Sequence, residues 1–251
     1  MVHKPRIMKL QNKSIIVTGS SKGIGKEIAL LLAQNGAELV VNYHSNKDAA
    51  DSTVKEILNL GCKAIAIKAD VSVKDDFTRL FDNAIEAYGK VDVLINNAGI
   101  MINKHVKNYT EDDFQAIINV NLKGVFNGLQ EADEKLADHG NIINFSSSTV
   151  KMMLPTYGLY SASKAAVEQL TRVFSKEIGR GISVNSIAPG PTETELFLEG
   201  KSEEFIEKLK GMSAFNRIAD PIDIAKVVLF LASDDSKWIS GQVILANGAV
   251  V

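Results

Sequence analysis

The stretch SIIVTGSSKGIGKEIALLLAQNGAELVVNY, residues 14–43, decides the fold class. It begins with a short apolar run at 14–19, which predicts a buried strand, and then passes through a glycine-rich turn. Residues 23–35 carry apolar side chains at helical spacing, and AELVVNY (37–43) predicts a second strand. Both strands are apolar almost throughout instead of alternating with polar residues. This pattern predicts a parallel sheet that is covered by helices on both faces.

The same alternation of strand and helix continues along the rest of the chain. Further strands are predicted at 63–70, 91–99, 141–146, 182–190 and 242–247, and helices at 47–61, 73–89, 110–136, 157–179 and 221–232. Right-handed crossovers then favour an α/β, doubly wound fold of the Rossmann type with a seven-stranded parallel sheet. We expect a single domain over residues 9–251, with a flexible tail at 1–8 and a substrate-loop insert at 191–215 that includes a helix near 201–211.

The composition and charge of the chain exclude several classes of partner. The 251 residues are 45% hydrophobic and carry a formal net charge of -2 with no long like-charged block, so we expect neither nucleic-acid nor membrane binding. No segment approaches the apolar run of a secretory signal or the roughly 18 apolar residues of a membrane span. The lone cysteine, Cys62, cannot form an internal disulfide, which favours a reducing compartment and a cytoplasmic location.

The glycine-rich turn TGSSKGIG (18–25) lies between the first strand and its helix. Glycines at this place allow a tight turn and let a phosphate reach the backbone N–H groups at the positive end of the helix. An ATP-type phosphate loop is disfavoured, because Lys26 is followed by Glu27 instead of Ser or Thr. The turn therefore indicates dinucleotide binding, and a turn that needs glycine only for its shape is the alternative.

With its spacing TGxxxGxG, the turn is the first of several motifs that resemble those of the short-chain dehydrogenase/reductase family. The others are NNAG (96–99), Asn121 in NVNLKGVF, Ser147 in NFSSS, the pair Tyr160-xxx-Lys164 and PGPTET (189–194). They occur in the family's order on matching predicted elements, and the resemblance runs from Lys9 to Asn247. It implies an oxidoreductase that transfers hydride between a nicotinamide dinucleotide and a carbonyl compound or alcohol.

Two tyrosines precede the lysine in TYGLYSASKAAV (156–167). Residues four apart on a helix lie on one face at adjacent turns, so Lys164 is expected beside Tyr160. Tyr157 is seven residues before Lys164, which corresponds to about two turns or about 10 Å. Spacing alone therefore selects Tyr160 as the proton donor. We expect the Lys164 ammonium and the nicotinamide charge to stabilise the phenolate and to bring the pKa of Tyr160 toward neutrality.

The resemblance implies two further catalytic residues. It places a serine thirteen residues before the tyrosine, which selects Ser147 as the group that hydrogen-bonds the substrate oxygen. Strand alternation agrees, since Ser146 and Ser148 are expected to point to the opposite side. Asn121 matches the family residue that holds a water in the proton relay to the lysine, and an amide that merely kinks its helix is the alternative.

NADP(H) is the expected cofactor. An acidic residue at the end of the second strand would favour NAD, but Tyr43 stands there. His44 and Ser45 follow as hydrogen-bond donors, and Lys22 adds a positive charge in the glycine turn. The full set of expected cofactor-binding residues is Gly19, Ser21, Lys22, Ile24, Gly25, Tyr43, His44, Ser45, Asp70, Val71, Asn97, Ala98, Gly99, Tyr160, Lys164, Pro189, Gly190, Thr192 and Thr194.

The substrate is less constrained by the sequence than the cofactor. We expect Ser147, Met153, Tyr157 and Leu196 to line the substrate pocket, and no metal site, because the four histidines have no metal-ligand spacing. The interpretation that we prefer is the NADPH-dependent, reversible reduction of a small or medium free ketone or aldehyde to an alcohol.

Two other functions stay open at this point. In a 3-oxoacyl-[acyl-carrier-protein] reductase, Arg180 would match one basic docking residue, but QEADEKLADHGN (130–141) is acidic where such a surface is basic. A non-catalytic NADP-binding regulator is the second alternative, and the complete set of Ser147, Tyr160 and Lys164 argues against it. The resemblance also implies a homo-oligomer, a tetramer or a dimer, that pairs through the fourth and fifth helices and the last strand.

Overall fold

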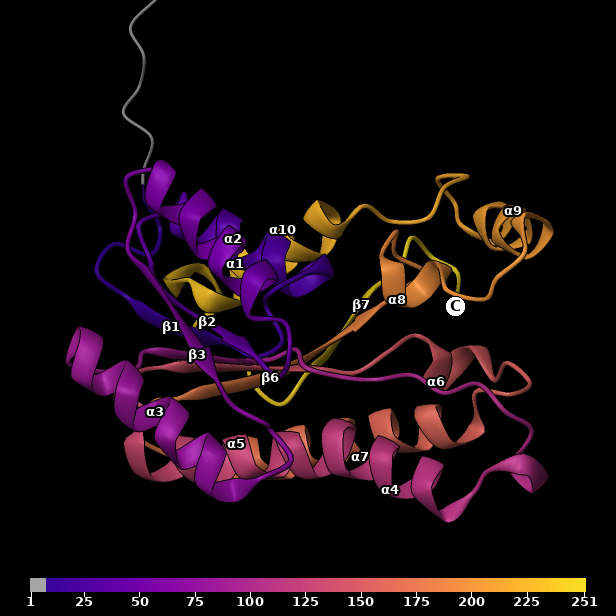
Figure 1. The fold of residues 1–251 in the computed structure, drawn as a ribbon, viewed down its shortest axis with the longest axis horizontal. Coiled ribbons are helices and arrows are strands. Elements are labelled where there is room, and N and C mark those ends of the chain that lie inside the picture. The colour runs from indigo at the N-terminus through magenta and orange to yellow at the C-terminus, as the bar shows by residue number, and fades with distance from the viewer. Residues whose placement is uncertain (1–7) are drawn as a thin grey trace, which may run out of the picture.

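The computed structural model describes residues 8–251, so the predicted tail at 1–8 lies outside the described residues except for Met8. The centre of the protein is a sheet in the order β3-β2-β1-β4-β5-β6-β7, in which every neighbouring pair is parallel (Figure 1). This confirms the predicted seven-stranded, doubly wound sheet. The strands are β1 (Ser14–Val17), β2 (Glu38–Tyr43), β3 (Ala64–Lys68), β4 (Val93–Asn96), β5 (Asn141–Phe145), β6 (Ser183–Pro189) and β7 (Val243–Ala246).

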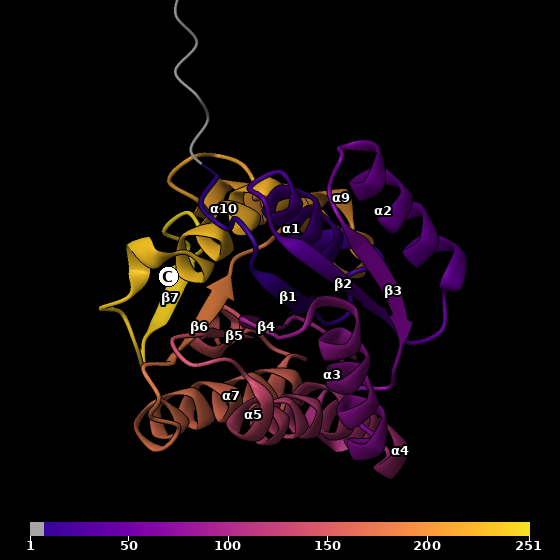
Figure 2. The ribbon, with the colours of Figure 1, turned by 90° about the vertical axis from the view of Figure 1, so that its left-hand side faces the viewer.

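Helices cover both faces of the sheet (Figure 1, Figure 2). One layer holds α1 (Gly23–Ala33), α2 (Lys47–Asn59) and α10 (Pro221–Ala232), and the other holds α3 (Lys74–Tyr88), α5 (Gly124–Lys135) and α7 (Gly158–Glu177). Successive side chains of a strand point to opposite faces, so Ile15 and Val17 of β1 join the core under the first layer and Ile16 joins the core under the second. Burial on both faces explains why the strands are apolar almost throughout.

The order of the strands reverses at the centre of the sheet. Strand β1 pairs with β2 on one side and with β4 on the other. The connections that follow β1 and β4 therefore leave in opposite directions, and a crevice opens between them at the carboxyl ends of these strands. The glycine turn (18–25) and the NNAG segment (96–99) follow β1 and β4 directly, so both motifs reach this crevice.

The structure differs from the predicted single helix at 110–136. The segment is divided into α4 (Glu111–Ile118), a π-helical turn (Asn119–Lys123) and α5. A π-helical turn is rare and shifts the residues that follow it around the helix axis, and such turns often occur at functional sites. The other short elements that the sequence pattern did not predict are η1 (Val106–Asn108), α6 (Thr149–Met152) and η3 (Asp234–Ser236), and the insert contains α8 (Glu195–Leu198) and α9 (Glu203–Met212).

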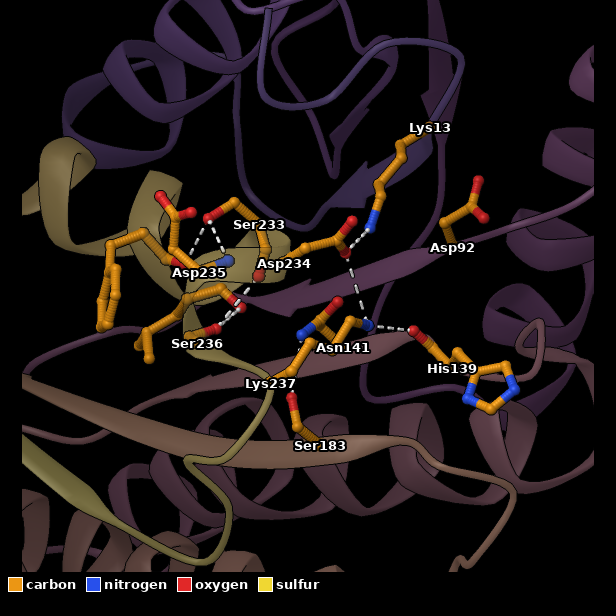
Figure 3. A network of polar contacts seen from close by, with 12 residues as sticks. Lys13, Asp92, His139, Asn141, Ser183, Ser233, Asp234, Asp235, Ser236 and Lys237 are labelled. Carbon is orange, nitrogen blue, oxygen red and sulfur yellow. Dashed lines mark hydrogen bonds and ion pairs between the residues drawn. The ribbon is translucent and has the colours of Figure 1, made fainter.

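A network of charged side chains closes the opposite, amino-terminal edge of the sheet (Figure 3). Lys13, which precedes β1, lies 3.0 Å from the Asp234 carboxylate, and Lys237 lies 3.7 Å from the same carboxylate. Lys237 also donates a hydrogen bond to the backbone carbonyl of His139. Exposed ion pairs of this kind contribute at most about 1 kcal/mol each, so the network fastens η3 to the sheet edge without dominating its stability.

Helix α5 lies unusually close to the sheet because two of its residues have no side chain. A Cβ added at Gly128 would lie 2.6 Å from Asn96 Oδ1 and 2.8 Å from Phe77 Cζ. A Cβ added at Gly124 would lie 2.8 Å from Val71 Cγ2. These distances are too short for real atoms, so both glycines are required by the close approach of α5 to the loop after β3 and to the end of β4.

We therefore expect Gly128→Ala to lower the free energy of unfolding by about 1–3 kcal/mol, because the added methyl group overpacks the contact with Asn96 and Phe77. Gly211→Ala is the matched control: Gly211 lies in α9 with no atom near its added Cβ, so this variant should be as stable as the parent or slightly more stable. Urea denaturation of the three proteins measures the difference. Equal midpoints for both variants would contradict the packing argument.

Candidate active site

A cavity of about 590 Å³ occupies the crevice at the carboxyl ends of the strands. Every residue that we predicted to bind the cofactor lines this cavity, and so do Ser147, Tyr157 and Leu196 among the predicted catalytic and substrate-binding residues. Two predicted residues do not line it: Asn121 lies behind its wall, and Met153 lies outside. The fold thus brings residues from β2, β5, β6, α1 and α7, and from the loops after β1, β3 and β4, to one place.

The glycine turn forms the end of the cavity at the start of α1. Gly19 and Gly23 have φ angles of +63° and +56°, which side chains disfavour. A Cβ added at Gly25 would lie 2.5 Å from the carbonyl oxygen of Gly19 and 2.6 Å from Asn97 Nδ2. Asn97 Nδ2 in turn donates to the carbonyl oxygens of Thr18 (2.8 Å) and Gly19 (3.1 Å). The NNAG segment therefore holds the turn in shape.

The start of α1 suits the pyrophosphate of a dinucleotide. Lys22 is the N-cap residue, and its side chain makes no capping hydrogen bond to the first turn. The residues of that turn line the cavity at the positive end of the helix dipole, where backbone N–H groups at the start of a helix have no partner within the helix. The absence of a Cβ at Gly25 lets the turn fold closely against Gly19 and Asn97. The residues present therefore fit a nicotinamide dinucleotide.

At the end of β2 the cavity wall contains the residues that we expect to distinguish the two dinucleotides. Tyr43 is buried, and the exposed His44 follows it, with Nε2 3.5 Å from Asp70 Oδ2. Lys22 Nζ lies 2.9 Å from Glu195 Oε2, and both side chains are exposed. Nothing in the sequence indicates this ion pair, because Lys22 and Glu195 lie far apart in the chain and come together only in the folded structure.

Tyr160 and Ser147 both line the cavity, and they lie close enough together for the Ser147 hydroxyl group to lower the pKa of the phenol. Ser147 Oγ accepts hydrogen bonds from the backbone N–H of Thr149 (3.2 Å) and from Thr149 Oγ1 (3.0 Å). Thr149 was not among the predicted site residues. Its only signal in the sequence is its position two residues after Ser147 at the end of the strand.

Lys164 lies behind Tyr160 and is only 3% exposed. Its Nζ donates a 2.9 Å hydrogen bond to the carbonyl oxygen of Phe145 and lies 5.9 Å from the centre of the Tyr160 ring. Burial lowers the pKa of Lys164 from 10.5 to about 8. This lysine is therefore close to its titration range near neutral pH.

The expected lowering of the pKa of Tyr160 does not occur in the protein alone. Burial raises the pKa of the phenol above its ordinary value, and the hydrogen bond with Ser147 opposes only part of this effect. The Lys164 ammonium is directed to the Phe145 carbonyl instead of the phenol oxygen, and the nicotinamide charge, the other cause that we expect to lower this pKa, belongs to the protein with bound cofactor. The protein by itself thus keeps Tyr160 in its neutral, proton-carrying form.

Asn121 is fully buried at the centre of the π-helical turn. Its Oδ1 accepts from the backbone N–H of Ile100 (2.8 Å), and its Nδ2 donates to the carbonyl oxygen of Ile100 (2.9 Å). A Cβ added at Gly99 would lie 3.3 Å from Asn121 Oδ1 and 3.4 Å from Lys164 Nζ. Gly99 thus lies next to both the Asn121 amide, from the π-helical turn, and the Lys164 ammonium, from α7.

The predicted substrate residues divide into two groups. Tyr157 lines the cavity, and Leu196 of α8 lines it from the insert. Met153 differs from our prediction, because its side chain is 84% exposed. Its backbone is left-handed, with φ +53°, and the neighbours Met152 and Leu154 line the cavity instead. Other apolar residues in the lining include Ile100, Met101, Phe197 and Leu209.

Known proteins are similar to this chain in sequence and in architecture. The family model described as Enoyl-(Acyl carrier protein) reductase matches residues 19–250. A short-chain type dehydrogenase/reductase of Picea abies is 41% identical over 253 residues, which cover 96% of this chain and 93% of that protein. This chain belongs to the short-chain dehydrogenase/reductase family. The resemblance noted in the sequence is thereby confirmed, and the chain is an oxidoreductase of this family that uses a nicotinamide dinucleotide.

Two further proteins are similar over nearly the whole chain. The versicolorin reductase of Emericella nidulans is 40% identical over 254 residues, covering 96% of each protein. The structure of the angucycline C-6 ketoreductase LanV with bound NADP superposes with a TM-score of 0.90 at 38% identity, again covering 96% of each chain. Between residues 8 and 251, no helix is both long enough and apolar enough to span a membrane.

The buried Lys164 gives a stability prediction. Below pH 8 the lysine is protonated in both the folded and the unfolded chain. Between pH 8 and 10.5 the folded chain releases this proton while the unfolded chain still holds it. The unfolded state then binds more protons, so the free energy of unfolding should rise with pH relative to Lys164→Met. Urea denaturation of both proteins across this window measures the difference, and parallel pH profiles would contradict the shifted pKa.

Proposed function

We propose that this protein reduces a free ketone or aldehyde to an alcohol with NADPH, and that Tyr160, Ser147, Lys164 and Asn121 carry out the reaction. One observation supports this assignment above the others: Tyr160 and Ser147 lie near one another in the lining of the cavity, with the Lys164 ammonium buried behind them. Two adjacent hydroxyl donors suit an oxygen atom on which negative charge develops.

The reaction divides between the cofactor and the protein. NADPH, when bound, supplies the hydride that reaches the carbonyl carbon. Ser147 donates a hydrogen bond to the carbonyl oxygen, and Thr149 fixes the orientation of the Ser147 side chain. Tyr160 gives its proton to the same oxygen, which it can do because burial keeps the phenol neutral. The Lys164 ammonium stabilises the phenolate that results. A water held by Asn121 then returns a proton to Tyr160 by way of Lys164. In reverse, the same groups oxidise a secondary alcohol.

The preference for NADP(H) is supported by the charges around the end of β2. Tyr43 ends this strand where a carboxylate would repel a 2′-phosphate, and Lys22 and His44 line the same end of the cavity. The related ketoreductase LanV was solved with bound NADP. We propose that Lys22 exchanges its exposed partner Glu195 for the 2′-phosphate of the cofactor.

The substrate end of the cavity favours an apolar molecule. Aliphatic, thioether and aromatic side chains line it, from Ile100 and Met101 on one side to Leu196 and Phe197 of the insert on the other. Relatives named for their substrates include a versicolorin reductase and an angucycline C-6 ketoreductase. We propose that the substrate is a free, mainly apolar ketone or aldehyde, and that the insert at 191–215 within the single domain closes over it.

The structure weakens the case for an acyl-carrier substrate. The Arg180 guanidinium donates hydrogen bonds to the carbonyl oxygens of Leu136 (2.7 Å), Ala132 (3.0 Å) and Asp133 (2.6 Å). It also lies 3.3 Å from the Asp138 carboxylate. The basic residue that would dock an acidic carrier is therefore occupied at the end of α5, beside acidic residues that would repel such a partner.

We also propose a cytoplasmic homo-oligomer, a tetramer or a dimer. Phe126 of α5 and Val173 of α7 expose large apolar side chains on neighbouring helices, and Trp238 is fully exposed next to the edge strand β7. Apolar groups of this kind on helix faces and sheet edges favour association. Static light scattering of the purified protein gives the mass in solution, and a monomer at micromolar concentration would refute the oligomer.

Tyr160→Phe tests the proposed chemistry. We expect carbonyl-dependent NADPH oxidation to fall by roughly 10²–10⁴-fold, because the proton donor is lost, while the affinity for NADPH stays unchanged. Tyr157→Phe is the matched control, because it removes a hydroxyl group from the same helix end. It should keep most of the activity, since Tyr157 is not the proposed proton donor. A panel of aldehydes, ketones, acyl thioesters and enoyl thioesters provides the substrate. If the parent protein reduces none of the carbonyl compounds, the non-catalytic regulator becomes the better explanation.

Lys22→Ala tests the cofactor assignment. Loss of a charge-assisted contact with a phosphate costs about 1.5–3 kcal/mol, so kcat/KM for NADPH should fall roughly 10- to 100-fold. The value for NADH should change little, because NADH lacks the 2′-phosphate. Lys26→Ala, one turn further along α1, is the control for the loss of a positive charge. An equal loss with both dinucleotides would show that Lys22 does not contact the 2′-phosphate.

A further inference from the structure

The hydroxyl group of Ser146 and the carboxylate of Glu168 form a buried hydrogen bond directly behind the candidate site. Ser146 Oγ donates to Glu168 Oε1 at 2.8 Å, and the two residues are 3% and 7% exposed. Ser146 follows β5 and precedes Ser147, whereas Glu168 lies in α7, the helix that carries Tyr160. We propose that Glu168 is a positioning residue, which holds the end of β5 against α7 and thereby sets the position of Ser147 relative to Tyr160.

The direction of the side chains at the end of β5 supports this role. Neighbouring residues of an extended chain point to opposite sides, so Ser146 faces α7 and Ser147 faces the cavity. The backbone N–H of Ser146 donates to the carbonyl oxygen of Ile187 at 2.8 Å, which fixes the same residue to β6. A movement of Ser146 would be passed directly to Ser147, because the two residues are joined by one peptide bond.

The face of α7 that meets β5 carries Tyr160, Lys164 and Glu168 at intervals of four residues. Lys164 binds the carbonyl oxygen of Phe145, and Glu168 binds the side chain of the next residue, Ser146. The strand end is thus attached to the helix at two consecutive residues. We assign Lys164 to the proton transfer, so its charge changes during the reaction. The hydrogen bond between Glu168 and Ser146 takes no part in the transfer and can stay unchanged.

The environment of Glu168 keeps its carboxylate in place. Its second oxygen, Oε2, lies 3.3 Å from Arg172 NH2, one turn further along α7. Burial of a carboxylate costs free energy that an apolar side chain of similar size would not cost, so overall stability is a poor explanation for its presence. A directed hydrogen bond fixes relative position more closely than apolar packing does. Displacement of a catalytic group by about 1 Å can lower a rate by about 10²-fold, which gives such a bond a function.

The test compares Glu168→Leu with Glu168→Gln. Leucine removes the acceptor for Ser146, whereas glutamine keeps an acceptor oxygen of nearly the same shape. We expect Glu168→Leu to lower kcat roughly 10- to 100-fold with an unchanged affinity for NADPH, and Glu168→Gln to restore most of kcat. Gln169→Leu is the control for a new leucine on α7, because Gln169 is exposed and next to Glu168. Equal losses in the leucine and glutamine variants would overturn the proposal.

Two further measurements separate positioning from a general structural effect. The proposal rests on the role assigned to Ser147, so in a Ser147→Ala background Glu168→Leu should cause little additional loss of kcat. A loss of the same size in both backgrounds would show that Glu168 does not act through Ser147.

Crystal structures of the two Glu168 variants provide a readout that does not depend on turnover. The distance between the Ser147 and Tyr160 hydroxyl groups should increase in Glu168→Leu and stay at its parent value in Glu168→Gln. An unchanged distance in the leucine variant would overturn the positioning role even if the enzyme is active. Conversely, an increased distance in a protein that reduces no carbonyl compound would leave the positioning role in place and refute only the proposed function.

Discussion

The site depends on one buried ammonium group, that of Lys164. A charge without solvent is costly unless it is hydrogen-bonded, and here the carbonyl oxygen of Phe145 supplies the bond at the end of β5. This contact brings α7 to the strand end and thereby sets Tyr160 opposite Ser147. Asn121 and Gly99 close the other side, since any side chain at Gly99 would meet the amide and the ammonium. The catalytic face is therefore built around the requirement to bury and satisfy a single charge.

Glycine residues also shape this arrangement, because they let backbone segments approach closely. Gly25 lets the first turn fold against Asn97, and Gly124 and Gly128 let α5 approach the loop after β3 and the end of β4. Because α5 is fixed closely at these points, the preceding π-helical turn directs Asn121 into the interior, where it binds the backbone of Ile100. The same glycines thus allow both the close packing of α5 and the placement of Asn121 in the candidate site.

The two walls of the cavity differ in how firmly they are held. The wall built from β4, β5 and α7 is joined by buried hydrogen bonds, such as that between Asn96 and Asn144 (2.9 Å). The insert is joined to the glycine turn by the exposed pair of Lys22 and Glu195, and such pairs contribute little to stability. The firmly held wall fits the proton transfer that we propose there, and the apolar side chains of the insert fit the substrate recognition that we propose for it.

The sequence by itself determined the features that depend on local periodicity. Apolar strands between amphipathic helices specified the parallel sheet, and the four-residue spacing of Tyr160 and Lys164 placed both on one helix face. Only the tertiary structure decided contacts between distant segments: the pairing of Lys22 with Glu195, the support of Ser147 by Thr149, and the exposure of Met153. It also decided that burial raises the pKa of Tyr160. The physical reason is that hydrogen-bond partners and loss of solvent are set by packing, which local spacing does not specify.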